Sequence, residues 1–231
     1  MQTLTVLSGG AAQGLFASIE AMLRERHGSA VDGTFGAVGM MRAKLADGHP
    51  ADVVVLTAAI LRDLADGGEV IAETVTDIGR VETAIAVRGD DPAPDVADAA
   101  ALKHALLDAD AVYVPDIVQS TAGIHFASVL ERLGIADALK QRLRMFPNGA
   151  TAMRALATAP ERRPIGCTQV TEILSTPGIR LIAPLPKGCD LATTYTAGVV
   201  ARSPSKDAAR ALIKLLAGPD TAEVRASCGF T

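Results

Sequence analysis

The feature that most constrains the fold is the alternation of short, β-branched runs with Ala- and Leu-rich segments of helical periodicity. The first unit consists of a strand predicted over 3–7, a turn over 8–10, and a helix in which Leu15, Ile19 and Leu23 recur on one face. Strands that alternate with helices in this way are typical of parallel sheets with crossover helices. The sequence therefore predicts an α/β protein.

The same alternation continues along the chain. Further strands are predicted over 31–35, 52–56, 80–87, 111–114, 144–146, 165–167, 179–183 and 193–201. Further helices are predicted over 38–45, 58–66, 122–133, 150–157, 170–174, 205–216 and 219–227. The strong loop signal over 89–95 is expected to mark the point where the chain leaves its first domain.

Composition excludes several classes of function. The chain has 231 residues and a formal net charge of −4, and it contains no block of consecutive basic residues, so we expect no nucleic-acid binding. The three cysteines have no CxxC spacing and the four histidines are scattered, which argues against a metal site. Neither a dinucleotide fingerprint nor a P-loop is present, so we expect no cofactor.

The sequence also bears on location. No apolar stretch approaches the roughly 20 residues that cross a bilayer, so no membrane insertion is expected. The first residues lack the features of a signal peptide. We expect a cytoplasmic protein from the sequence as it stands, and a periplasmic one if a signal peptide has been removed ahead of Met1.

Several predicted strands end in a turn of small residues that leads directly into a helix. Four such turns lie over 8–11, 35–38, 119–123 and 147–150. Free backbone N–H groups at a helix N-terminus favour an anion without any Lys or Arg. Small residues at these positions also serve simply to cap helices and to turn tightly, so each turn alone carries either interpretation.

The order of these segments resembles the molybdate-binding family of ABC-transporter solute receptors. The resemblance rests on 6–15, 34–39, 50–55, 122–134, 165–172 and 208–230. It implies the type II periplasmic binding protein fold, in which each lobe is a mixed, mainly parallel sheet flanked by helices. It further implies one lobe over 1–82 and 195–231 and a second over 83–194, linked by two crossing strands near 82–87 and 193–199.

The resemblance also implies a ligand site, in which serine hydroxyls, backbone amides and a tyrosine hold a tetrahedral oxyanion. Here Ala11, Ala37 and Val38 stand where the family has serines, and Gln169 stands at the tyrosine position. Because hydroxyl donors are missing, an organic carboxylate is a better expectation than molybdate. The expected ligand contacts are Ser8, Gly9, Gly10, Ala11, Gly36, Ala37, Val38, Ser120, Thr121, Ala122, Gly123, Asn148, Gln169 and Tyr195.

Three functions remain open. The first is a monomeric solute-binding protein that closes its lobes on a small anion and delivers it to an ABC permease if it is secreted. The second is an isomerase of an unsaturated polycarboxylate, because members of the wider group with a Gly-Gly-Ala first loop resemble aconitate isomerase. Its candidate catalytic residues are His125, Glu172 and Tyr195, with Asp116 as a further possible base. The third is an anion-responsive module that signals to a partner protein.

Overall fold

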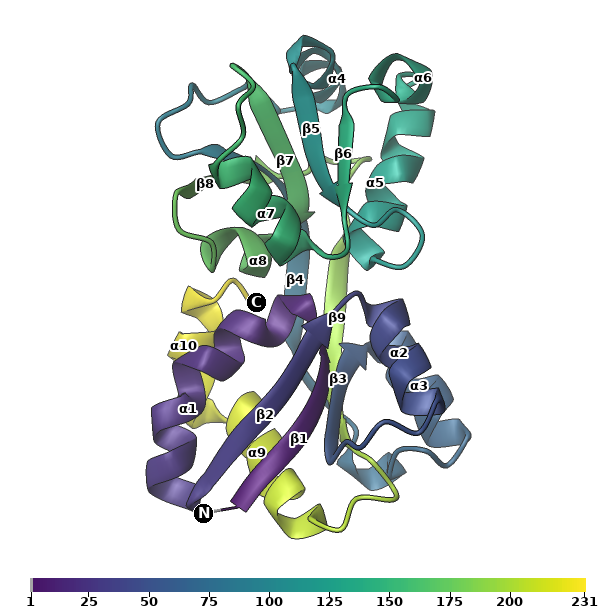
Figure 1. Cartoon of the computed structure of the whole chain (residues 1–231), viewed down its shortest axis with the longest axis vertical. Coiled ribbons are helices and arrows are strands. Elements are labelled where there is room, and N and C mark those ends of the chain that lie inside the picture. Colours follow the sequence, from purple (N-terminus) through teal and green to yellow (C-terminus); the bar gives the residue numbers. More distant parts are fainter. Residues whose placement is uncertain (1) are drawn as a thin grey trace. The chain divides into compact units, whose positions relative to one another are not determined.

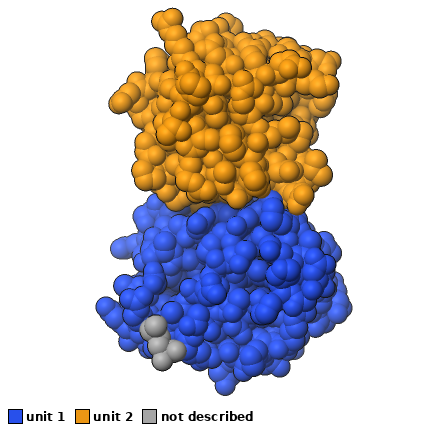
Figure 2. Space-filling model, viewed as in Figure 1, with its two compact units in different colours: residues 1–81, 193–231 blue, residues 82–192 orange. Residues whose placement is uncertain are grey.

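The structure is a computed structural model that describes residues 2–231 (Figure 1). The chain forms two compact units (Figure 2). Unit 1 comprises residues 1–81 and 193–231, and unit 2 comprises residues 82–192. Two strands, β4 (Thr76–Arg88) and β9 (Ala192–Val199), have residues in both units.

Unit 1 contains a sheet of strand order β2-β1-β3-β9, followed by the first part of β4. Its other elements are β1 (Gln2–Gly9), η1 (Gly10–Ala12), α1 (Gln13–His27), β2 (Ser29–Gly36), α2 (Val38–Ala46), β3 (Val53–Thr57), α3 (Ala58–Asp66), η2 (Ala72–Thr74), α9 (Lys206–Ala217), η3 (Pro219–Thr221) and α10 (Ala222–Ser227). Strand β1 pairs parallel with β2 and β3, whereas β3 pairs antiparallel with β9.

Helices cover both faces of this sheet. The chain passes from β1 to β2 in one direction and from β2 to β3 in the other, so right-handed crossovers place α1 and α2 on opposite faces. The residues Val53–Leu56 of β3 are fully buried, as expected for a strand covered on both sides. Strand β3 therefore lies in the interior of unit 1.

Unit 2 repeats this arrangement with the strand order β4-β7-β5-β6, and β8 pairs with β4 on its other edge. Its elements are α4 (Ala99–Asp108), β5 (Ala111–Pro115), α5 (Thr121–Arg132), α6 (Ala136–Leu139), β6 (Leu143–Phe146), α7 (Gly149–Ala157), β7 (Pro164–Gln169), α8 (Val170–Leu174) and β8 (Ile179–Pro184). The core gathers Leu102, Leu106, Val112, Val114 and Phe126.

Each unit has a topological switch point at one strand, β1 in unit 1 and β5 in unit 2. The two strands that follow it in the chain lie on opposite sides of it in the sheet. Parallel strands run to both sides of β1 and of β5, and β7 pairs antiparallel with β4. Ligands of open α/β sheets bind at the carboxyl ends of strands around such switch points. The topology thus predicts that ligand-binding residues lie in the loops after β1 and β2 in unit 1, and in those after β5, β6 and β7 in unit 2.

The predicted α/β class is confirmed, but some details differ from the expectations. Helix α4 was not predicted, although Asp98 accepts hydrogen bonds from the backbone N–H groups of Ala100 and Ala101 and caps it. The loop over 89–95 lies inside unit 2 and leads to α4, and the chain passes from unit 1 to unit 2 at residues 81–82, within β4. Among residues 2–231, no helix is both long and apolar enough to cross a membrane.

Candidate functional site

In unit 1, the end of β1 brings together two of the predicted loops and the predicted tyrosine. The parallel register places Gly9 beside Gly36, where β1 and β2 both end. A Cβ atom at Gly9 would lie 3.0 Å from Cε1 of Tyr195 and 3.0 Å from Cγ1 of Val38. Glycine therefore lets the backbone approach the tyrosine ring and the first turn of α2 more closely than a residue with a side chain would without movement of these neighbours.

The helices that begin at this edge start without side-chain caps. Gly9, Ala12 and Ala37 occupy the N-cap positions of η1, α1 and α2, and none of them makes a side-chain cap hydrogen bond within the described chain. The missing caps follow from the small apolar residues at these positions, because only Ser, Thr, Asp or Asn supplies an oxygen there. These helix starts therefore have no N-cap side-chain oxygen paired with their first backbone N–H groups.

Two further residues predicted as ligand contacts in unit 1, Ser8 and Tyr195, are buried and contact other parts of the unit. The hydroxyl of Ser8 donates to the carbonyl of Gly9 at 2.9 Å. Tyr195 lies opposite Thr57 in the β3–β9 ladder, and its ring packs edge-on against Phe230 with a centroid distance of 6.4 Å. Both side chains therefore help to fix the shape of this edge of unit 1.

In unit 2, the end of β7 carries buried polar atoms that lack partners. Gln169 is 3% exposed, yet neither its amide nitrogen nor its amide oxygen has a hydrogen-bond partner among residues 2–231. The hydroxyls of Thr83 and Thr171, both buried, also lack partners there. Since Thr83 is directly opposite Gln169 in the antiparallel β4–β7 pair, their side chains lie on one face of the sheet.

Such a group of orphaned atoms is costly for a folded protein. Each buried donor or acceptor without a partner costs about 1–3 kcal/mol relative to a satisfied one. Native structures keep few of them, and they occur where a ligand or water completes the bonding. Gln169 offers both a donor and an acceptor, so its full set of partners includes both an acceptor and a donor.

The neighbouring residue Glu172 fills a different role. Its carboxylate accepts a hydrogen bond from the hydroxyl of Thr168 at 2.5 Å, and it is hydrogen-bonded by the backbone of Ala150, Gln169 and Gly149. Burial raises the pKa of Glu172, and these hydrogen bonds oppose the rise. The chain thus places its own carboxyl group at the N-terminus of α7, one of the four predicted anion sites.

The same helix start also holds Asn148. Its side-chain oxygen accepts a hydrogen bond from the backbone N–H of Thr151 at 2.8 Å and caps α7. The side-chain oxygen of Asn148 is therefore used inside unit 2, and its amide nitrogen is the group left for a ligand.

The loop after β5 leads into α5. One carboxylate oxygen of Asp116 accepts hydrogen bonds from the backbone of Val118 at 2.7 Å and of Gln119 at 2.8 Å, so this side chain shapes the turn. Ser120 occupies the N-cap position of α5 without a side-chain cap hydrogen bond in the described chain. The amides of Thr121, Ala122 and Gly123 form the first turn of α5 behind it.

His125 lies one turn further along α5 and is half-buried. Its Nε2 atom lies 2.7 Å from the carbonyl oxygen of Cys189. A carbonyl oxygen only accepts, so Nε2 is the donor of this contact. This contact fixes the orientation of the His125 ring within unit 2.

The structure therefore groups the predicted residues within each unit. In unit 1 it brings Gly9, Gly36, Val38 and Tyr195 to one strand edge, with Ser8, Gly10, Ala11 and Ala37 beside them. In unit 2, Gln169 and Glu172 lie around the start of α8, whereas Ser120, Thr121, Ala122, Gly123 and His125 belong to α5. Residues 2–231 contain no cluster of His, Cys, Asp or Glu that could hold a metal ion.

Sequence reasoning missed Thr83 and Thr168. Nothing in the sequence marks Thr83, because its position opposite Gln169 depends on the register between β4 and β7. Thr168 stands four residues before Glu172, but its role depends on Glu172 turning back toward the end of β7. Both residues become visible only once strand register and burial are known.

Comparison with known proteins finds related sequences and similar structures. A curated relative named aconitate isomerase, from Pseudomonas sp, is 29% identical over 235 residues, which cover 99% of this chain and 87% of the relative. The periplasmic molybdate-binding protein of Azotobacter vinelandii has a similar structure, with a TM-score of 0.82 and 15% identity over 99% of this chain and 98% of that one. The sulfate-binding protein SubI of Mycobacterium tuberculosis gives a TM-score of 0.77 and 17% identity over 100% of this chain and 86% of that one.

The two solved structures establish the periplasmic binding protein fold, and the resemblance expected from the sequence is confirmed. The model of the family described as bacterial extracellular solute-binding protein matches residues 4–231, which is nearly the whole chain. The chain belongs to this family of bacterial extracellular solute-binding proteins.

Proposed function

We propose that this protein binds a small organic anion with more than one carboxylate group. The observation that carries the proposal is the orphaned group of Gln169, Thr83 and Thr171 in unit 2. A fully deprotonated tetrahedral oxyanion only accepts hydrogen bonds, so it would leave the amide oxygen of Gln169 without a partner. An organic acid with a hydroxyl or a protonated carboxyl group supplies both the acceptor and the donor.

The uncapped helix starts supply the remaining contacts in the proposal. Backbone amides at Gly10, Val38 and Thr121 favour carboxylate oxygens, and separate loops hold separate carboxylates. The alanines at positions 11 and 37 remove hydroxyl donors that a compact oxyanion would use. A larger ligand with spaced acceptors therefore fits this donor set better than molybdate or sulfate.

In this proposal the ligand is held by loops of both units, which close on it through bending of β4 and β9. Closure of this kind makes selectivity depend on contacts from both units at once. An ABC permease is the partner that we propose for the protein, since solute-binding proteins bring ligands to such permeases.

A melting scan tests the proposal. Tungstate, molybdate and sulfate are compared with di- and tricarboxylates, with and without a hydroxyl group, on the wild-type protein. We expect a clear rise in melting temperature with a carboxylate and little change with tungstate. A large rise in melting temperature with tungstate alone would contradict the inference that alanines at positions 11 and 37 disfavour a compact oxyanion.

The variant Gln169→Leu examines the orphaned group directly. Removing two unpaired buried atoms should stabilise the unliganded protein by about 1–2 kcal/mol while abolishing stabilisation by the carboxylate. Gln141→Leu is the matched control, because Gln141 is exposed in the same unit. If Gln169→Leu retained full ligand stabilisation, Gln169 would not be a ligand contact.

A second candidate function is isomerisation of an unsaturated polycarboxylate, favoured by the relative named aconitate isomerase. In this reaction a base removes a proton from the methylene carbon, the electron pair spreads over the allylic system, and a proton returns to the other end. His125 is the proposed base, because in the neutral ring Nδ1 keeps a lone pair while Nε2 donates to Cys189.

Proton NMR of cis- and trans-aconitate in deuterated buffer tests this candidate. Interconversion of the isomers or deuterium uptake would support the enzyme. We then expect His125→Gln to abolish turnover and to retain ligand-induced stabilisation. Unchanged spectra, together with stabilisation by one carboxylate, would leave the binding protein as the function.

A further inference from the structure

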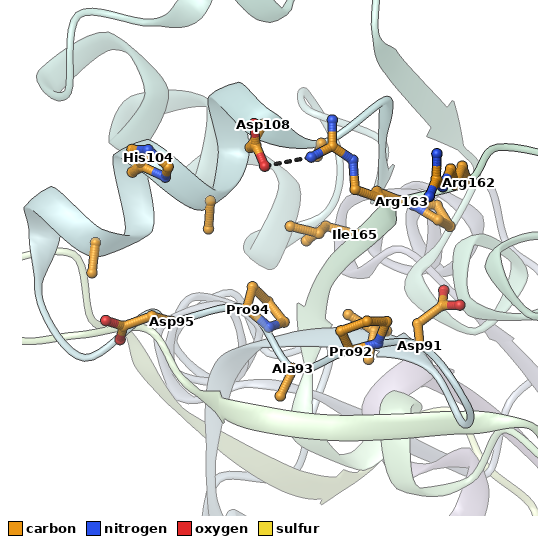
Figure 3. Close-up of a pocket in the computed structure, with 15 residues that line it drawn as sticks. Asp91, Pro92, Ala93, Pro94, Asp95, His104, Asp108, Arg162, Arg163 and Ile165 are labelled. Atoms are coloured by element: carbon orange, nitrogen blue, oxygen red, sulfur yellow. Dashed lines mark hydrogen bonds and ion pairs between the residues drawn. The ribbon is translucent and has the colours of Figure 1, made fainter.

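Unit 2 contains a cavity at the opposite end of its sheet from Gln169. The cavity has a volume of about 340 Å³ and lies between the 91–95 loop, α4 and the beginning of β7 (Figure 3). Pro164 and Ile165, at the first residues of β7, form part of its wall, whereas Gln169 is the last residue of that strand. The cavity is therefore separate from the loops assigned to the proposed anion site.

The cavity is mostly apolar. Its walls include the buried side chains of Val87, Ala109 and Ile165, with the partly buried Ala105 on α4. Pro92 and Pro94 line the opposite side (Figure 3). Small-molecule sites in proteins are typically concave and apolar, have volumes of about 300–1,000 Å³ and contain a few polar groups.

Two ion pairs at the rim are already complete. Asp91 accepts hydrogen bonds from Nε of Arg88 at 2.6 Å and from its NH2 group at 3.0 Å. Asp108 forms an ion pair with Arg163 at 2.5 Å (Figure 3). These four side chains neutralise one another, so they add little charge with which to attract a ligand.

The hydrogen-bonding capacity that remains is mainly that of a donor. Within residues 2–231, the guanidinium of Arg162 and the imidazole of His104 have no hydrogen-bond or ion-pair partner, and both side chains line the cavity. The backbone of Arg162 is anchored, because its carbonyl accepts from Arg88 at 3.3 Å. Asp95, by contrast, already accepts a hydrogen bond from the backbone N–H of Ala97 at 3.0 Å.

We propose that this cavity is a second ligand site that binds a small monocarboxylic acid with an apolar body. The apolar body fills the space between Ala105, Ile165 and Pro94, and the carboxylate accepts hydrogen bonds from Arg162. The guanidinium presents paired N–H groups that match a carboxylate. Because Arg162 is exposed, apolar contact supplies most of the affinity and the arginine orients the acid.

The test uses 3-phenylpropanoate as the probe and its neutral amide as the matched compound, with isotope-labelled full-length protein followed by NMR. We expect the acid to shift the resonances of Val87, Ala105 and Ile165, and the amide to bind about two- to fivefold more weakly. No shift with the acid, or shifts confined to residues outside the cavity, would overturn the proposal.

Two variants and one control complete the experiment. Arg162→Ala should weaken the acid about two- to fivefold and leave the amide unchanged, whereas Arg132→Ala, at an exposed arginine of α5 outside the cavity, should alter neither. Ala105→Leu should reduce binding of both compounds because it fills the cavity. Equal binding of the acid to wild-type protein and Arg162→Ala would refute the role of the arginine, and undiminished binding to a folded Ala105→Leu would refute the site.

Discussion

Replacement of Gly149 by alanine should displace the carboxyl group of Glu172 from the N-terminus of α7. A Cβ atom at position 149 would lie 1.9 Å from Oε2 of Glu172 and 2.0 Å from Oγ1 of Thr168. Non-bonded heavy atoms do not approach one another this closely in native proteins, so one partner has to move. Both side chains are buried, with exposed fractions of 5% and 0%, so neither is able to swing into solvent without opening the local packing.

The magnitude follows from the hydrogen bonds that are lost. The carboxylate is bonded by the hydroxyl of Thr168 and by backbone groups that include Gly149 and Ala150. Several donors bond this carboxyl group, and each buried donor left unpaired costs about 1–3 kcal/mol. We therefore expect Gly149→Ala to lower the free energy of unfolding by about 2–4 kcal/mol, since some relaxation of the site offsets part of the loss.

Urea unfolding at neutral pH measures this effect. Gly89→Ala is the matched control, because the nearest atom to a Cβ at Gly89 lies 3.6 Å away and this substitution should be close to neutral. In a Glu172→Ala background the cost of Gly149→Ala should become smaller, since one of the two collisions has been removed. An equal cost in both backgrounds, or a Gly149→Ala protein as stable as Gly89→Ala, would refute the reasoning.

Three further outcomes are expected. Burial raises the pKa of Glu172 above its ordinary value of 4.5, so the folded protein holds this proton more tightly than the unfolded chain. The stability of the wild type relative to Glu172→Gln should be greatest below pH 4.5 and should fall as pH rises through the folded pKa. Urea midpoints across pH measure it, and a difference that grows with pH would contradict the assignment. Burial and a hydrogen bond to Glu161 at 2.8 Å raise the pKa of Tyr113 to about 12, so Tyr113→Phe should remove a strongly alkaline phenolate absorbance step. Retention of that step would assign it to the other of the two tyrosines. Asp98→Ala should lower the free energy of unfolding by about 0.5–2 kcal/mol through loss of the α4 cap, and an unchanged urea midpoint would show that the cap adds nothing.

The local pattern of the sequence was sufficient for most secondary-structure elements. Helix α3 spans the predicted 58–66, and α8 spans the predicted 170–174. These predictions succeeded because helical periodicity and turn residues are local signals. Helix α4 was not predicted, although Asp98 and the Ala- and Leu-rich run after it carry the same local signals.

Less of the candidate site could be predicted from the sequence. Small residues after the strands indicated which helix starts would have free amides, and the structure shows Gly9, Ala37 and Ser120 without side-chain caps in the described chain. The loop at Asn148 carries the same signal, but there the chain supplies its own cap and its own carboxyl group from Glu172. The sequence does not distinguish these cases, because the deciding partner lies on another element.

The sequence by itself determined the alternation of strands and helices, the small residues at the strand ends and the substitutions at Ala11 and Ala37. Only the tertiary structure decided that Thr83 faces Gln169 and that both lack hydrogen-bond partners within the described chain. It likewise decided that α7 binds the carboxyl group of Glu172. The physical reason is that periodicity and capping act between near neighbours in the chain, whereas burial and hydrogen-bond satisfaction depend on strand register between distant segments.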